Sequence, residues 1–247
     1  MIRTAALSIG SMLLAEAALA VDCTSVSFKE TQFTICEVDA TQDKLELFLR
    51  DESGKILGQF SSVNRLLQET GQELSFAMNA GMYHEDRAPV GHYKENGIEV
   101  MRIIPNAGPG NFGLLPNGVL CLRLNRADVF ETLTYLEKSP DCIDATQSGP
   151  MLVIDGALHP RFLKDSTSTF VRNGVGTSAD GKRAVFAISD EPVNFYNFGL
   201  LFRDYLKLPN ALYLDGNISR LYAPAIGRSD FGFALGPIIG VVEPLPK

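Results

Sequence analysis

Turn-forming residues recur along the whole chain and limit it to short structural elements. The 247 residues include 22 glycines and 13 prolines, without a linker rich in either and without an internal repeat. Because glycine and proline end regular elements, the apolar segments between them predict many short strands and few helices. Segments 33–38 and 45–50 alternate apolar and polar residues, which is typical of strands, and Asp-Glu-Ser-Gly at 51–54 predicts the turn after the second.

The other apolar segments extend this pattern. Further strands are predicted at 74–78, 98–104, 119–124, 151–154, 183–188 and 211–214. Two segments have helical spacing: 61–69, which Ser61 or Ser62 is expected to cap, and 194–206, with four aromatic or leucine residues on one side. Strands outnumber helices and are interleaved with them. This order predicts a single α+β domain, with a mixed or antiparallel sheet and a few helices packed against it.

The N-terminal segment has the three parts of a secretory signal peptide. Arg3 supplies the positive charge, residues 5–19 are mostly apolar, and Ala-Leu-Ala at 18–20 is a cleavage pattern of small residues. The alternative is a transmembrane anchor, but the apolar segment is shorter than the ~20 residues that a spanning helix needs. We therefore expect residues 1–20 to be removed, leaving a domain over 21–247 that is periplasmic or secreted, without a membrane span.

The chain has four cysteines, an even number that suits an oxidising compartment. Their spacing includes no Cys-x-x-Cys pair of a zinc site. Of the three possible connectivities, Cys23–Cys36 and Cys121–Cys142 are favoured, because each pair is close in sequence. Four buried free thiols are the alternative.

Charge and missing motifs exclude several classes of function. A net charge of −7 argues against binding nucleic acid and gives no reason to expect binding to anionic membranes. The sequence has no Gly-x-Ser-x-Gly elbow and no phosphate-binding P-loop, which argues against a serine esterase and a nucleotide-binding protein. The three histidines have no ligand spacing. We expect neither a metal nor another cofactor.

Candidate site residues follow apolar strands directly. Asn79, the segment Gln147-Ser148-Gly149 and the pair Asp215-Gly216 each place polar and small residues where a strand ends. A strand fixes a side chain and a glycine lets a ligand approach the backbone, although the same sequences also form ordinary turns. Arg172 stands shortly before Gly174, so its planar guanidinium and nearby glycine N–H groups suit a phosphate or carboxylate; a surface arginine in a turn is the alternative.

Five segments together resemble a known family. They are FAMNAGMY (76–83), NFGLLPNGVL (111–120), ATQSGPMLVIDGALHP (145–160), RNGVGTSADGKRAVFAIS (172–189) and NALYLDGNISRLYAP (210–224). They resemble the phosphodiester glycosidase domain family, to which the lysosomal uncovering enzyme belongs, and within it the bacterial YigE-like branch. The resemblance implies hydrolysis of a glycosidic bond whose leaving group is a phosphate ester.

The resemblance also implies roles for individual residues. Arg172 would bind the phosphate, and Asp215 would act as general acid/base or nucleophile. The residues expected to bind or orient substrate are Asn79, Gln147, Ser148, Gly149, Gly174, Gly216 and Ser219. For a second catalytic carboxylate, Asp190 and Glu191 are the candidates, with ordinary turn residues as the alternative.

One departure from the family pattern leaves other functions open. Relatives read Asp-Gly-Gly-Gly-Ser where this chain has Asn217 and Ile218 in place of two glycines. The first hypothesis is an exported hydrolase of sugar-1-phosphodiesters that acts on envelope glycans. The second is a non-catalytic envelope protein that binds glycans or takes part in exopolysaccharide assembly. The third is a metal-dependent phosphodiesterase that uses Asp155, Asp190 and Asp215.

Overall fold

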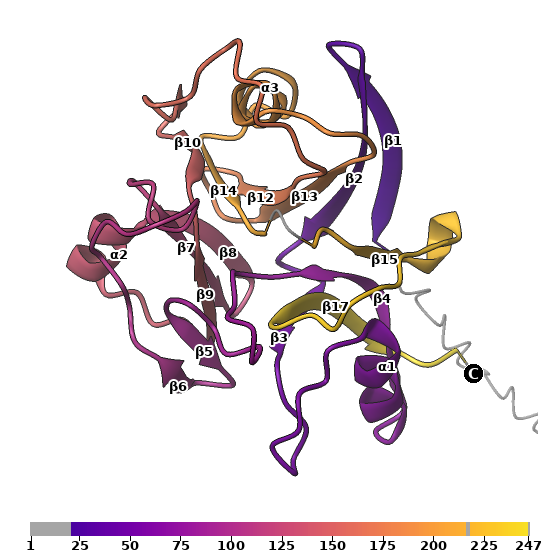
Figure 1. The fold of residues 1–247 in the computed structure, drawn as a ribbon. Coiled ribbons are helices and arrows are strands. Elements are labelled where there is room, and N and C mark those ends of the chain that lie inside the picture. Colours follow the sequence, from indigo (N-terminus) through magenta and orange to yellow (C-terminus); the bar gives the residue numbers. More distant parts are fainter. Residues whose placement is uncertain (1–20, 216–217, 247) are drawn as a thin grey trace, which may run out of the picture.

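The structure is a computed structural model that describes residues 21–215 and 218–246. Three antiparallel sheets make up most of it, and each sheet has a helix beside it (Figure 1). The predicted α+β class and antiparallel pairing are therefore confirmed. The predicted signal peptide, residues 1–20, and the site candidate Gly216 lie outside the described residues.

The largest sheet has seven strands in the order β1-β2-β13-β12-β14-β10-β11. Every neighbouring pair in it is antiparallel. Its strands in this order are Asp22–Phe28, Thr31–Asp39, Arg183–Ser189, Asn173–Thr177, Asn210–Tyr213, Met151–Ile154 and Ala157–Leu158.

Two five-stranded antiparallel sheets complete the fold. One has the order β16-β15-β4-β17-β3, with strands Arg228–Ser229, Leu221–Ala223, Gln72–Asn79, Ile238–Pro244 and Lys44–Phe48. The other has the order β6-β5-β9-β7-β8, with strands Ile98–Met101, Tyr93–Glu95, Asp144–Ser148, Gly118–Arg123 and Arg126–Glu131.

The helices are short. They are α1 (Phe60–Gln68), α2 (Thr132–Lys138) and α3 (Phe195–Leu200), which continues into the π-helical turn η1 (Leu201–Tyr205); η2 (Pro224–Ile226) is a 3-10 turn. The expected cap of α1 by Ser61 or Ser62 is wrong. The helix already begins at the buried Phe60, and the residue before it, Gln59, gives it no side-chain cap. The amide of Gln59 instead accepts a hydrogen bond from Arg220.

Strand β13 shows why the seven-stranded sheet has two apolar faces. Its even-numbered residues, such as Phe186 and Ile188, contact a core that all three sheets share. Its odd-numbered residues, Val185 and Ala187, contact a second core beneath α3 and η1. A strand covered on both faces becomes continuously apolar, as 184–188 is.

Strand β12 was not predicted, because its two glycines resemble a turn. They are packing requirements instead. A Cβ on Gly174 would lie 2.8 Å from the carbonyl oxygen of Leu212 on the neighbouring strand, and one on Gly176 would lie 2.7 Å from a Leu208 methyl group. Only a residue without a side chain fits between these neighbours.

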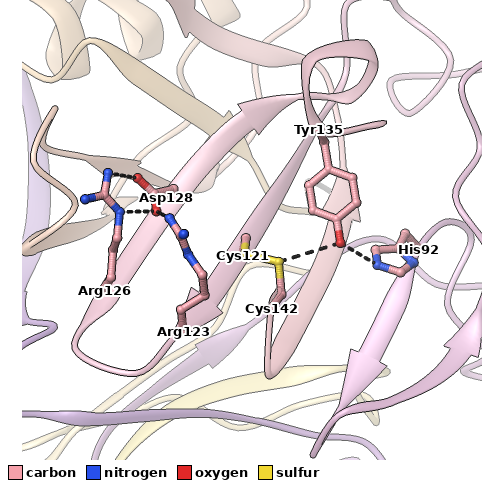
Figure 2. Close-up of a disulfide and its surroundings, with 7 residues drawn as sticks. All are labelled: His92, Cys121, Arg123, Arg126, Asp128, Tyr135 and Cys142. Carbon is pink, nitrogen blue, oxygen red and sulfur yellow. Dashed lines mark hydrogen bonds and ion pairs between the residues drawn. A yellow bond between two sulfur atoms is a disulfide. The ribbon is translucent and has the colours of Figure 1, made fainter. Parts of the chain in front are cut away.

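Both predicted disulfides are present. Cys23 and Cys36 face each other across β1 and β2, and Cys121 on β7 joins Cys142 in the segment before β9. The second bond lies near Tyr135 of α2, whose hydroxyl oxygen is 3.0 Å from Nε2 of the buried His92 (Figure 2). Within the described residues, no helix is long and apolar enough to cross a membrane.

Candidate functional site

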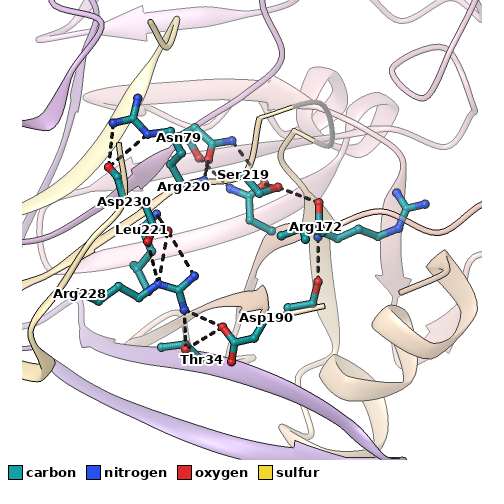
Figure 3. A network of polar contacts seen from close by, with 12 residues as sticks. Thr34, Asn79, Arg172, Asp190, Ser219, Arg220, Leu221, Arg228 and Asp230 are labelled. Atoms are coloured by element: carbon teal, nitrogen blue, oxygen red, sulfur yellow. Dashed lines mark hydrogen bonds and ion pairs between the residues drawn. The ribbon is translucent and has the colours of Figure 1, made fainter. Parts of the chain in front are cut away.

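Three strand ends from different sheets meet at one point. Asn79 is the last residue of β4, Asn173 the first of β12, and Ser148 the last of β9. Asp215 follows β14, which pairs with β12 so that the end of one strand lies beside the start of the other. We call Asn79, Ser148, Asn173, Asp215 and Ser219 the strand-end cluster; part of it is drawn in Figure 3.

Asn173 connects most of this cluster. Its Oδ1 accepts a hydrogen bond from the backbone N–H of Asp215 at 3.1 Å, and its Nδ2 donates to the carbonyl oxygen of Asn79 at 3.2 Å. The Nδ2 group of Asn79 lies 3.4 Å from Asn173 Oδ1. Both asparagines are completely buried. Paired amides satisfy each other in a place without access to water, and they fix where Asp215 leaves its strand.

Two serines hold the same region from other directions. The hydroxyl of Ser148 donates to the carbonyl oxygen of Leu214, the residue before Asp215. The hydroxyl of Ser219 lies 2.9 Å from the carbonyl oxygen of Asp215 and 3.0 Å from that of Val171. The backbone on both sides of the Asp215 side chain is therefore fixed by side-chain contacts.

Asp215 is half-buried, and its negative charge affects the pKa of two tyrosines. Burial raises the pKa of Tyr83 to about 12, and the negative charge of Asp215 adds to this effect. Burial also raises the pKa of Tyr213 to about 12; Asp215 again adds to it, while the positive charge of Arg172 opposes it. Both phenols therefore stay protonated at neutral pH and add no charge beside Asp215.

Arg172 lies next to Asn173 in the chain, but its side chain takes another direction. Its guanidinium points away from Asn79 and Ser219 (Figure 3). Three of its N–H groups contact protein acceptors: the carbonyl oxygen of Val193 at 2.7 Å, that of Ser168 at 3.1 Å and the hydroxyl of Tyr213 at 3.2 Å.

An aromatic ring covers the same guanidinium. The ring centroid of Phe195 is 3.7 Å from its central carbon, and the side chain of Arg172 has no exposed surface. A phosphate would have to displace these contacts to reach it. This geometry favours a role for Arg172 in positioning Tyr213.

Gln147 makes a separate structural clamp. Its Oε1 accepts from the backbone N–H groups of His92 and Ile104, both at 3.0 Å, and its Nε2 donates to the carbonyl oxygen of Ile104 and to Thr132. It thereby fixes the segment after Met101, where the predicted strand 98–104 ends early.

The two described candidate glycines are tightly surrounded. A Cβ on Gly149 would lie 2.6 Å from Asn117 Cβ, and Gly174 packs between strands as described above. Gly149 precedes Pro150 through a cis peptide bond. Close packing by itself accounts for glycine at both positions.

The three aspartates of the alternative, metal-dependent hypothesis do not come together. Strands β10 and β14 are antiparallel, so Asp155, after β10, lies at the opposite end of the pair from Asp215. Asp190 forms an ion pair with Arg228 at 2.7 Å, and Glu191 accepts from the backbone of Gln32. The three-aspartate hypothesis is therefore wrong. Among the residues that the structure describes, no group of three or more potential ligands is placed to hold a metal ion.

A cavity of about 340 Å³ lies elsewhere, next to Asp43, Asn96 and Asp144. Asp144 begins β9 and Ser148 ends it, so this cavity and the strand-end cluster are at opposite ends of the strand. The carboxylate of Asp144 already accepts from the backbone N–H groups of Asn96 and Leu47. These contacts indicate a structural role for Asp144.

Sequence comparison identifies the family. Residues 72–231 match the family of phosphodiester glycosidases. This chain belongs to that family. The matched segment contains the whole strand-end cluster. Over 205 residues, the chain is also 32% identical to a protein of Escherichia coli strain K12 named uncharacterized protein YigE. The aligned segment covers 83% of this chain and 80% of the Escherichia coli protein. The resemblance seen in the five sequence segments is confirmed.

Solved structures share the fold of this phosphodiester glycosidase family member. The catalytic domain of zebrafish N-acetylglucosamine-1-phosphodiester alpha-N-acetylglucosaminidase, auto-inhibited by its pro-peptide, matches with a TM-score of 0.60, 11% identity and coverage of 90% of this chain and 81% of that one. A hypothetical protein from Synechocystis matches with a TM-score of 0.58, 12% identity and coverage of 89% and 61%. At such identities the likeness shows the fold alone.

Sequence reasoning missed three residues of this region. Asn173 gives no separate signal, because an asparagine followed by Gly174 is an ordinary turn pattern. Tyr83 and Tyr213 stand in segments that carry the family resemblance, but a tyrosine next to apolar residues gives no signal that separates a core ring from a site hydroxyl.

Replacing Asn173 with alanine tests its role as the connector. The change leaves the N–H of Asp215 and the carbonyl oxygen of Asn79 without their partner, so we expect the free energy of unfolding to fall by roughly 2–4 kcal/mol. Denaturant titration measures it. The exposed Asn106→Ala variant, as control, is expected to change it by less than about 0.5 kcal/mol. Equal stabilities of the two variants would contradict this role.

Proposed function

We propose that the protein is an exported hydrolase that cleaves the glycosidic bond of a sugar-1-phosphodiester, with envelope glycans as its substrate class. The observation that carries the proposal is the placement of Asp215. This carboxylate follows a buried strand within the family-matched segment, and its backbone is held by Asn173, Ser148 and Ser219. Its negative charge acts on the neutral phenols of Tyr83 and Tyr213. A rigidly held carboxylate is what acid–base or nucleophilic catalysis at an anomeric carbon requires.

The proposed reaction places its charges as follows. The bond between the anomeric carbon and the bridging oxygen breaks, and its electron pair stays with the phosphate ester, a good leaving group. Water supplies the hydroxyl that forms the new bond to the anomeric carbon, and its proton is released. Asp215 either accepts this proton as a general base or first forms a glycosyl ester that water hydrolyses. Inverted or retained configuration of the released sugar distinguishes the two routes.

The other candidate residues have supporting roles in this proposal. Asn79 and Ser219 position the Asp215 segment, together with Ser148. Gln147, Gly149 and Gly174 shape the surrounding backbone. Arg172, expected from the sequence to bind the phosphate, is here a positioning residue that holds the hydroxyl of Tyr213.

Export is part of the proposal. Two disulfides suit an oxidising compartment, and a putative exported protein from Burkholderia pseudomallei K96243 shares the fold with a TM-score of 0.53 at 11% identity, covering 87% of this chain and 74% of that one. We expect cleavage before Val21 and release into the periplasm or the medium. Mass spectrometry of the fractionated protein tests this; a cytoplasmic protein that retains residues 1–20 would contradict it.

Replacing Asp215 with asparagine is expected to abolish most turnover. The change keeps the shape of the side chain but removes its basicity, so the rate on sugar-1-phosphodiesters should fall roughly 10²- to 10⁴-fold. Assay of released sugar measures it. Asp155→Asn, an exposed turn residue at the other end of the β10–β14 pair, is the matched control and should keep full activity.

Two results would contradict the proposed reaction. One is Asp215→Asn with the turnover of the wild type. The other is wild-type protein that binds anionic glycans saturably in calorimetry but forms no product on a broad panel. The second result would favour the non-catalytic, glycan-binding alternative, which the replacement of two family glycines by Asn217 and Ile218 suggests.

Replacing Arg172 with alanine separates positioning from phosphate binding. Two carbonyl oxygens and the Tyr213 hydroxyl lose their donors, so we expect the free energy of unfolding to fall by roughly 3 kcal/mol and kcat to fall with it. Arg172→Lys should recover only part of the stability, because an ammonium lacks the planar fork. A large increase in KM for the phosphodiester with unchanged stability and kcat would instead assign Arg172 to the phosphate.

A further inference from the structure

The hydroxyl group of Tyr83 is buried without a hydrogen-bond partner. Tyr83 lies in the loop after β4, four residues beyond Asn79, and its ring is partly covered. Its hydroxyl oxygen has almost no exposed surface. The backbone N–H of Gly236 approaches this oxygen, but no group in the described part of the chain accepts the hydroxyl proton. Buried polar atoms in native proteins are nearly always paired, so one without a partner next to a candidate active site points to a ligand.

The ring of Tyr83 is held firmly in place. Gly236 lies against it so closely that a Cβ there would be 2.3 Å from the Cγ atom of the ring. The guanidinium carbon of Arg87 is 5.5 Å from the ring centroid, and Tyr83 forms an isolated bridge with Pro89. A hydroxyl on a ring fixed from several sides has a defined direction, which is what a specific contact to a substrate needs.

The surroundings of this hydroxyl are charged. Asp215 is close enough to raise the pKa of Tyr83 further, after burial has raised it, while Arg87, the backbone N–H of Gly236 and Arg220 act in the opposite direction. The hydroxyl therefore keeps its proton at neutral pH. It can donate one hydrogen bond without adding charge beside Asp215.

The two buried arginines nearby direct their donors to protein acceptors. Arg172 contacts Val193, Ser168 and Tyr213, as described above. Arg220 donates to the carbonyl oxygens of Asp230 and Phe233 and to the side chain of Gln59. A phosphate that binds beside Asp215 therefore needs a hydrogen-bond donor that is not already bonded to a protein acceptor. The neutral hydroxyl of Tyr83 provides one.

We propose that the hydroxyl of Tyr83 donates a hydrogen bond to a phosphate oxygen of the bound sugar-1-phosphodiester, on the leaving-group side of Asp215. This inference rests on the proposed function and adds a substrate-contacting residue to it. As the bond between the anomeric carbon and the bridging oxygen breaks, negative charge grows on the phosphate. A donor already fixed in position stabilises this charge more in the transition state than in the ground state.

The Tyr83→Phe variant tests the proposal. It removes the hydroxyl and keeps the ring, so turnover should fall roughly 10- to 100-fold, and the affinity for the phosphate monoester product, measured by calorimetry, should fall as well. The melting temperature should change little, because no described group accepts the proton of this hydroxyl. Tyr135→Phe is the matched control. Its hydroxyl contacts His92, so this variant should lose stability and keep its turnover.

The leaving group gives a second measurement. If Tyr83 contacts the phosphate, the defect of Tyr83→Phe should shrink for phosphodiesters with a more acidic alcohol, because their leaving group needs less stabilisation. A defect that is the same for all leaving groups would place the contact on the sugar and overturn the proposal. A lowered melting temperature would overturn its premise, since it would show that the hydroxyl has a partner in the protein.

Failure of this proposal and failure of the proposed function give different results. Active wild type with an equally active Tyr83→Phe variant, and equal affinities for the phosphate monoester, would overturn the role of Tyr83 alone. A wild type that neither turns over the phosphodiesters nor binds the phosphate monoester would overturn both. A wild type that binds the phosphate monoester without turnover would contradict the hydrolase, and the affinities of the two proteins would then decide the role of Tyr83.

Discussion

The amide pair of Asn79 and Asn173 is the contact on which the candidate site depends. It joins the end of β4 in one sheet to the start of β12 in another, and Asn173 also holds the backbone of Asp215. Both residues are completely buried, where an unpaired amide is costly. The pair therefore links the two sheets at the point where Asp215 leaves β14.

The apolar cores hold in place the strands that carry this amide pair. One core receives side chains from all three sheets, and a second lies between the seven-stranded sheet and α3. Strand β14 contributes to both, with Leu212 facing the first and Tyr213 the second. Tyr213 in turn binds Arg172, whose guanidinium is covered by Phe195. The buried guanidinium thus lies against the strand that ends at Asp215.

Much of the fold was predictable from local sequence patterns. The elements that these patterns did not predict share a cause. Alternation gave β2 and β3, and proximity in sequence gave both disulfides. Strand β12 was missed because its glycines are required by neighbours distant in the chain. The same limit applies to the site. The sequence indicated Asp215 and Asn79, but the burial that turns Arg172 inward and leaves the Tyr83 hydroxyl without a partner arises only when the three sheets meet.

A crystal structure with a non-hydrolysable sugar-1-phosphonate would show whether the strand-end cluster is the active site. If it is, the anomeric carbon will lie within ~3–3.5 Å of an Asp215 carboxylate oxygen. This assignment also predicts a phosphonate oxygen within hydrogen-bond distance of the Tyr83 hydroxyl. A ligand bound instead in the cavity beside Asp43 and Asp144, at the far end of β9, would contradict it, because the strand-end cluster would then be a structural joint between sheets and not the active site.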